Sequence, residues 1–122
     1  MVMAMTAPID RLRAICLALP EATERETWGE ATFRVREKIF AMAGTGRGRW
    51  AMSCKARPGL QGALVGTAPD RFFVPPYVGP KGWIGIYLGD ETDWDELVDL
   101  VEESYRMTAP KRVAALLDQS DT

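Results

Sequence analysis

The segment "TFRVREKIFAMAGTGRGRWAMSCK", residues 32–55, decides the fold of this 122-residue chain. Phe33 and Val35 alternate with polar residues, which predicts a strand with one buried face. A tight turn near Glu37 and the glycine-rich stretch "GTGRG" at residues 44–48 separate two further apolar stretches. Three strands joined by two such turns predict an antiparallel meander.

Apolar residues at helical spacing predict helices on both sides of this meander. Residues 8–19 carry one apolar stripe, and Pro20 ends it. A short helix is predicted over residues 58–66, a further strand over 83–88, and two helices over 92–105 and 109–117. The expected order is α-β-β-β-α-β-α-α. Because the helices flank the strands rather than alternate with them, the predicted class is α+β, an antiparallel meander sheet flanked by helices.

Composition and length predict one soluble globular domain over residues 1–122, with disordered ends at 1–7 and 118–122. No apolar run approaches the roughly 20 residues of a membrane span, so no membrane partner is expected. The start of the chain has no basic leader. Cys16 and Cys54 are interpreted as reduced core residues, which favours a cytoplasmic protein.

The chain contains no histidine, which removes the commonest general base and metal ligand. Two cysteines are too few for a four-ligand zinc site, and no serine or cysteine has a partner base visible in the sequence. Residues 90–103 hold eight acidic residues and no basic one, a pattern typical of the exposed face of an amphipathic helix. The chain is therefore expected to be no enzyme and to use no cofactor or metal.

Basic residues concentrate in the predicted meander, where residues 31–58 hold seven of them against the single acid Glu37. Such a concentration is usually a solvated surface, but arginines and lysines on hairpins also suit contacts with DNA phosphates. The candidate phosphate-contacting residues are Arg34, Arg36, Lys38, Arg47, Arg49, Lys55 and Lys81. The alternative hypothesis is a small-molecule or partner-binding pocket lined by Trp28, Tyr77 and Trp83, although aromatic residues are more often part of a core.

Three stretches in this order resemble the MmcQ/YjbR-like proteins. They are "LPEATERETWGEATFRVREKIFAM" (residues 19–42), "PPYVGPKGWIGIYL" (75–88) and "DWDELVDLVEESYRMTAPKRV" (93–113). The resemblance covers residues 9–117, nearly the whole chain. One departure is Glu30, which stands where many relatives carry a histidine.

The resemblance implies a CyaY-like α+β fold in a bacterial protein. It also implies double-stranded DNA as a partner, because the hairpins of the family look like a double wing, and it implies no catalytic activity. A founding member of the family is associated with antibiotic biosynthesis and resistance, which keeps a small-molecule role open. The meander's basic residues agree with the first function, whereas the net charge of −2 does not favour it.

Overall fold

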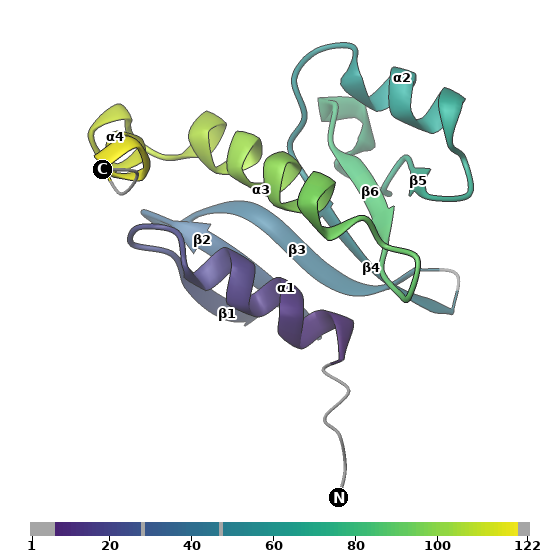
Figure 1. Ribbon diagram of the computed structural model, residues 1–122, viewed down its shortest axis with the longest axis horizontal. Coiled ribbons are helices and arrows are strands. Elements are labelled where there is room, and N and C mark those ends of the chain that lie inside the picture. Colours follow the sequence, from purple (N-terminus) through teal and green to yellow (C-terminus); the bar gives the residue numbers. More distant parts are fainter. Residues whose placement is uncertain (1–6, 28, 47, 120–122) are drawn as a thin grey trace, which may run out of the picture.

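The computed structural model describes residues 7–27, 29–46 and 48–119 (Figure 1). The helices in these ranges are α1 (Pro8–Leu17), α2 (Leu60–Thr67), α3 (Trp94–Thr108) and α4 (Lys111–Gln119), with a 3₁₀ turn η1 (Gly79–Lys81). The strands are β1 (Thr23–Thr27), β2 (Glu30–Val35), β3 (Lys38–Gly46), β4 (Arg49–Cys54), β5 (Phe72–Phe73) and β6 (Ile84–Tyr87). The predicted elements occur in their predicted order, so the α+β class is confirmed, and β1 and β5 are additions to it.

All strand pairs are antiparallel, and the sheet has the order β1-β2-β3-β4-β6-β5. The predicted meander forms its centre as β2, β3 and β4. The register shifts once between β2 and β3, next to Phe33, and such a shift bends a strand and strengthens its twist. The segment between β4 and β6 contains α2, β5 and η1, and β5 forms the last strand at that edge of the sheet.

The turn between β2 and β3 consists of Arg36 and Glu37, whose φ angles are 51° and 70°. Two consecutive positive φ values match the hairpin turn that follows the natural twist of the strands, although glycine or asparagine usually occupies it. Side-chain ion pairs hold this turn. Arg36 Nε donates to Glu21 Oε1 at 2.6 Å, and Arg25 Nη2 donates to Glu37 Oε1 at 3.0 Å.

The two unpredicted strands lie at the two edges of the sheet. The sequence of β1 is TERET, and its side chains are exposed apart from the half-buried Thr27. Pairing with β2 holds this strand in place, together with a 2.7 Å ion pair between Glu24 and Arg13 of α1. At the opposite edge, β5 contributes only two residues to the pairing with β6.

Helices α1 and α3 cross the same face of the sheet, and the main core lies between them and the strands (Figure 1). On β3 and β4 the buried side chains facing them alternate with others that point to the opposite face. The largest fully buried side chains include Phe33, Phe40, Leu12, Met52, Leu97 and Tyr105. The opposite face carries no helix in the described part of the chain and is called the open face below.

Tyr105 and Ser104 of α3 connect distant parts of the chain. The Tyr105 ring meets Phe40 edge to face, with 5.4 Å between the ring centres, and its hydroxyl donates to the Pro20 carbonyl at 2.6 Å. Ser104 Oγ donates to the Phe40 carbonyl at 2.6 Å and accepts from the Lys55 amide at 2.9 Å. These bonds fix α3 to both the meander and the end of α1.

The C-terminal end differs from the sequence-based expectation. Helix α4 continues to Gln119, so it includes two residues of the segment 118–122 that was expected to be disordered. Asp118, near the end of the helix, accepts a 3.0 Å hydrogen bond from Arg106 of α3. Residues 120–122 lie outside the described ranges.

Cys16 and Cys54 are buried, free thiols, which confirms their interpretation as reduced core residues. Burial raises the pKa of both thiols, that of Cys54 to about 12. Within the described ranges, no helix has the length and apolar character needed to cross a membrane.

Candidate functional site

Three lysines form a group at the end of the sheet where β3 begins and β4 ends. Lys38 is the first residue of β3, Lys55 follows β4 directly, and Lys81 closes η1 just before β6. The register of β3, β4 and β6 places these three positions at the same end. We call Lys38, Lys55 and Lys81 the lysine cluster.

The charges of this cluster act on one another. Burial, the largest cause, lowers the pKa of the Lys55 ammonium, and the nearby charges of Lys38 and Lys81 lower it further. No carboxylate in the described ranges lies within ion-pair distance of any of the three ammonium groups. The cluster is therefore a concentration of positive charge without an internal counter-ion.

Two arginines of the predicted phosphate-contacting set, Arg34 and Arg36, form hydrogen bonds within the protein. Arg34 donates to Thr27 Oγ1 at 3.1 Å and to Thr32 Oγ1 at 3.2 Å. Arg36 donates two hydrogen bonds to Glu21, and this pairing raises the pKa of the guanidinium and lowers that of the carboxyl. These two arginines are less available to an external anion than the lysines.

The structure does not bring all seven predicted residues together. Arg49 begins β4 opposite Gly46 and so lies at the end of the sheet away from Lys55. Its guanidinium carbon lies 4.3 Å from the centre of the Tyr87 ring. Arg47 lies outside the described residues. The candidate anion site is thus the lysine cluster, not the whole meander.

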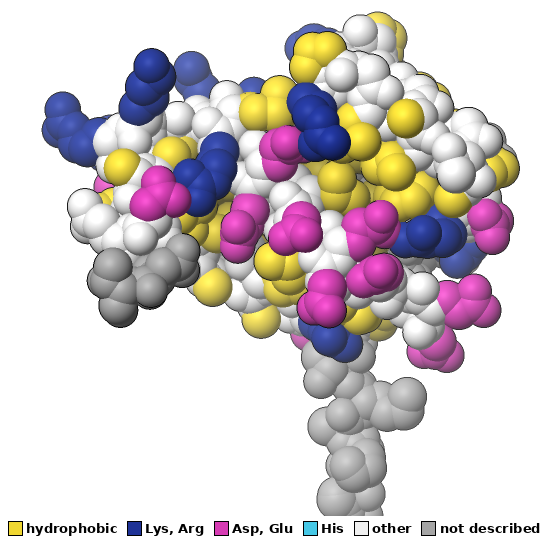
Figure 2. Space-filling view, turned by 45° about the horizontal axis from the view of Figure 1, so that its top comes forward, with side chains coloured by type: hydrophobic (Ala, Val, Ile, Leu, Met, Phe, Trp, Pro, Cys, Tyr) yellow, Lys and Arg dark blue, Asp and Glu magenta, His cyan; other side chains and the backbone are white. Residues whose placement is uncertain are grey.

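The acidic segment forms an exposed face of α3, as predicted. Figure 2 shows acidic side chains gathered along this helix, with basic side chains mainly around them. One of the acids, Glu103, is paired with Arg57 at 2.8 Å. A polyanion meeting this face would be repelled, so the helix-covered side is a poor surface for nucleic acid.

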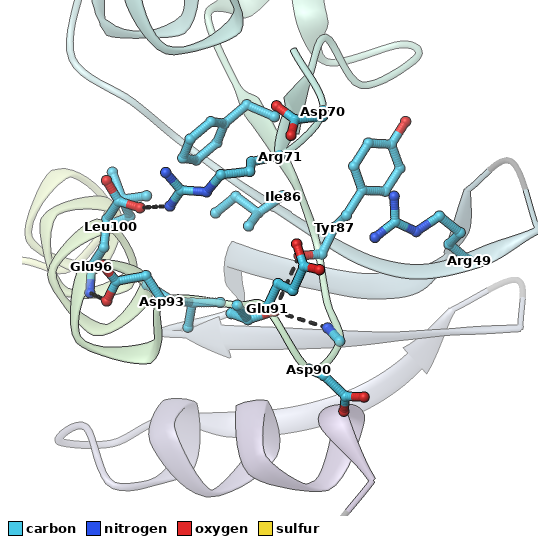
Figure 3. Close-up of a pocket in the computed structure, with 14 residues that line it drawn as sticks. Arg49, Asp70, Arg71, Ile86, Tyr87, Asp90, Glu91, Asp93, Glu96 and Leu100 are labelled. Atoms are coloured by element: carbon cyan, nitrogen blue, oxygen red, sulfur yellow. Dashed lines mark hydrogen bonds and ion pairs between the residues drawn. The ribbon is translucent and has the colours of Figure 1, made fainter. Parts of the chain in front are cut away.

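A cavity of about 450 Å³ lies at the end of the sheet occupied by Arg49 (Figure 3). Arg71 reaches across it from the segment before β5 and forms an ion pair with Glu96 of α3. Asp93 caps α3 by accepting from the Glu96 amide at 3.1 Å. The described residues contain no group of three or more acidic or cysteine side chains placed to hold a metal ion. The cavity therefore has mixed charge and no evident catalytic arrangement.

The structure places the two described residues of the predicted aromatic pocket in different surroundings. Trp83 is only 7% exposed and belongs to the protein interior, whereas Tyr77 is 94% exposed. Tyr77 also has a positive φ of 68°, unusual for a bulky residue. Trp28 lies outside the described residues. Tyr77 lines a cavity that Trp83 does not line.

That cavity is a groove of about 720 Å³ on the open face. Its floor is formed by β3 and β4, where Met42 pairs with Ser53 and Gly44 pairs with Ala51. The segment 75–78, which contains Tyr77, forms one wall. We call this cavity the open-face groove.

This groove was not predicted, because the apolar stretches of β3 and β4 were interpreted only as strands of the meander. A strand with one solvated face usually alternates apolar and polar side chains. In "KIFAMAG" (residues 38–44) no charged residue follows Lys38, so apolar or small side chains point to both faces. That lack of alternation was the available signal.

A family model described as YjbR matches residues 17–107, three quarters of the chain. The chain belongs to the YjbR family. No curated protein matches the sequence of this YjbR protein significantly. Among solved structures, the fold is similar to that of protein DR2400 of Deinococcus radiodurans, which contains a DUF419 domain. The TM-score is 0.73 with 20% identity, over 87% of this chain and 81% of the other, and this likeness concerns the fold.

Proposed function

We propose that this YjbR protein is a non-enzymatic DNA-binding protein whose lysine cluster contacts the phosphates of double-stranded DNA. The observation that carries the proposal is that Lys38 and Lys81 act electrostatically on Lys55 at one end of the sheet, while no carboxylate of the described residues pairs with any of the three. Holding like charges together costs free energy, and a bound anion offsets that cost.

Phosphate groups suit this arrangement. A lysine ammonium binds a phosphate as a point charge, and each contact releases counter-ions condensed on the DNA. Ser104 fixes the backbone of Lys55 through the 2.9 Å hydrogen bond from its amide, so the partly buried lysine starts from a defined position. Lys38 and Lys81 are exposed beside it.

Charge also favours one direction of approach. The acidic face of α3 repels DNA, so the duplex reaches the protein at the lysine end of the sheet rather than across the helices. The chemistry of the chain supports a binding role, because it has no histidine and both cysteines are buried with raised pKa values.

Fluorescence anisotropy with a labelled DNA duplex tests the proposal. We expect binding at low salt that weakens as salt rises, with a slope that falls by up to about 0.9 for each lysine removed. The informative variants are Lys38→Ala, Lys55→Ala and Lys81→Ala, alone and together. Lys111→Ala, in α4, is the matched control and should leave the slope unchanged. Absence of binding at low salt, or an equal effect of Lys111→Ala, would contradict the proposal.

A further inference from the structure

Small side chains keep the floor of the open-face groove low and so leave the groove deep enough to hold a ligand. Gly44 and Ala51 pair across β3 and β4. A Cβ atom at Gly44 would lie 2.8 Å from Oε2 of Glu30, closer than real contacts allow. The absence of a side chain at Gly44 therefore lets the Glu30 carboxylate lie over the floor of the groove.

Ser53 places a hydroxyl in this floor. Its side chain is among the buried polar ones, with 9% of the residue exposed, and it lines the groove. No described group forms a hydrogen bond with its hydroxyl, whereas the neighbouring buried Thr32 hydroxyl donates to the Arg25 carbonyl at 2.6 Å. No buried side-chain oxygen of the described residues lacks a hydrogen-bond partner, so the unpaired Ser53 hydroxyl is open to the groove and can bind a polar atom there.

The wall of the groove is aromatic and apolar. The Phe73 ring packs directly against Gly85, where an added Cβ atom would lie 2.4 Å from two ring carbons. Tyr77 projects from the segment 75–78 with its positive φ of 68°. A strained backbone that presents an exposed aromatic ring is frequent at binding sites.

The groove has one charged lining residue among those described, which is Glu30. No lysine or arginine of the described ranges is paired with its carboxylate. Glu30 therefore brings an unpaired negative charge to the groove, while the Arg34 guanidinium lies at its edge, bonded to Thr27 and Thr32. The unpaired carboxylate decides which class of ligand suits the groove.

We propose that the open-face groove binds a small molecule with a flat apolar body and a positively charged amine. The body lies over Met42 and Ala51 against the Phe73 and Tyr77 wall, and the amine lies beside Glu30, whose carboxylate covers Gly44. Ser53 supplies a hydrogen bond from the floor. A volume of about 720 Å³ is within the range of sites for drug-sized ligands. This site is independent of the lysine cluster, so either proposal can fail alone.

The test uses two planar probes of nearly equal shape, without DNA. The first, 9-aminoacridine, is a cation at neutral pH, and the second, acridine, is neutral. Fluorescence titration should show saturable binding of the cation, tighter than that of the neutral probe by about tenfold. Glu30→Gln should remove this difference, and Ala51→Phe, which fills the floor, should weaken both probes by at least about tenfold.

Two further variants keep the test informative if Ala51→Phe does not fold. Tyr77→Ala removes a 94% exposed ring and should weaken both probes without affecting folding. Leu116→Ala, at an exposed apolar side chain of α4, is the matched control and should change nothing.

Three results would overturn the proposal. They are no saturable binding of 9-aminoacridine, equal affinities for the two probes, and an unchanged preference in Glu30→Gln. Sedimentation velocity gives a fourth outcome. If the protein dimerises and Tyr77→Ala makes it monomeric, the open face binds a second copy of the chain and the small-molecule proposal is wrong.

Discussion

The two faces of the sheet carry similar side chains but have different surroundings. Met52 of β4 points toward the helices and is 2% exposed, whereas Met42 of β3 points to the open face and is half-buried. Cys54 and Ser53 are adjacent in β4 and also point to opposite faces. Folding explains the apolar residues under α1 and α3, because burial there stabilises the core. It does not explain those of the open face, which remain available to a ligand.

The largest effect that this comparison predicts is on stability. Met52→Ala removes a fully buried side chain and should lower the free energy of unfolding by about 2–5 kcal/mol. Met42→Ala, the same change on the other face, should cost less than about 1 kcal/mol, because its side chain is already partly in contact with water. Urea denaturation of the two variants measures both values. Equal losses would show that the open face is as well packed as the core.

The second prediction concerns Gly85, where Phe73 covers part of the open face. Gly85→Ala should destabilise the protein by about 1–3 kcal/mol, because its Cβ would overlap the Phe73 ring. Combining it with Phe73→Ala should make the two effects non-additive in a double-mutant cycle. Gly62→Ala, in open space on α2, is the control and should be neutral or stabilising. Additive effects would mean that the ring does not rest on Gly85.

The third prediction compares adjacent positions of β4 by thiol chemistry. In the native protein Cys16 and Cys54 should not react with a small methanethiosulfonate, because both are buried with raised pKa values. Ser53→Cys should add one thiol that reacts through the open-face groove. If Ser53→Cys is as inert as Cys54, the groove is closed to solutes.

Burial of these thiols also gives a pH dependence. An unfolded thiol ionises near pH 9, whereas folding raises the pKa of Cys54 to about 12. Below pH 9 the thiols are protonated in both states and the free energy of unfolding is unaffected. As pH rises from 9 toward 12, only the unfolded thiol ionises, so the free energy of unfolding falls. We expect each thiol to lower stability by roughly 1 kcal/mol at pH 10. In Cys54→Ala, urea denaturation at pH 7 and pH 10 should show a smaller loss of the free energy of unfolding, because the loss caused by that thiol is absent.

The smallest predicted effect is that of Lys81→Gln. Removing one positive charge from the lysine cluster should change stability by no more than about 0.5 kcal/mol, in the stabilising direction. It should also raise the pKa of Lys55, because one of the charges that lower it is removed. An NMR titration of the Lys55 side chain measures this pKa, with Lys111→Gln as the control. A lower pKa in Lys81→Gln would contradict the arrangement of the cluster.

The sequence predicted the elements whose side chains repeat regularly. The stripes of α1 and α3 and the alternation of Phe33 and Val35 were sufficient for the class and order of the fold. The strand β1 escaped prediction because its sequence TERET has no apolar face and is held by pairing with β2. The strand β5 is two residues long, too short for any periodicity.

The candidate sites were less predictable, because they depend on partners distant in sequence. Arg36 was equivalent to Lys38 in the sequence, yet the structure pairs it with Glu21, 15 residues away. Lys81 joins Lys55 only because β6 pairs with β4. Trp83 was proposed to line a pocket, but it lies just before β6 and is buried in the interior. The groove arises from the missing polar alternation of β3 together with a wall supplied by residues 75–78.

The hydrogen bond between Tyr105 and Pro20 joins residues 85 positions apart, and this affects the order in which the protein can fold during synthesis. The meander leaves the ribosome well before α3, which covers it. Until residue 105 is available, one apolar face of the nascent sheet has no cover and contacts of long sequence separation cannot form. Folding must therefore await nearly the whole chain, and a truncation within α3 would leave an aggregation-prone sheet rather than a smaller stable domain.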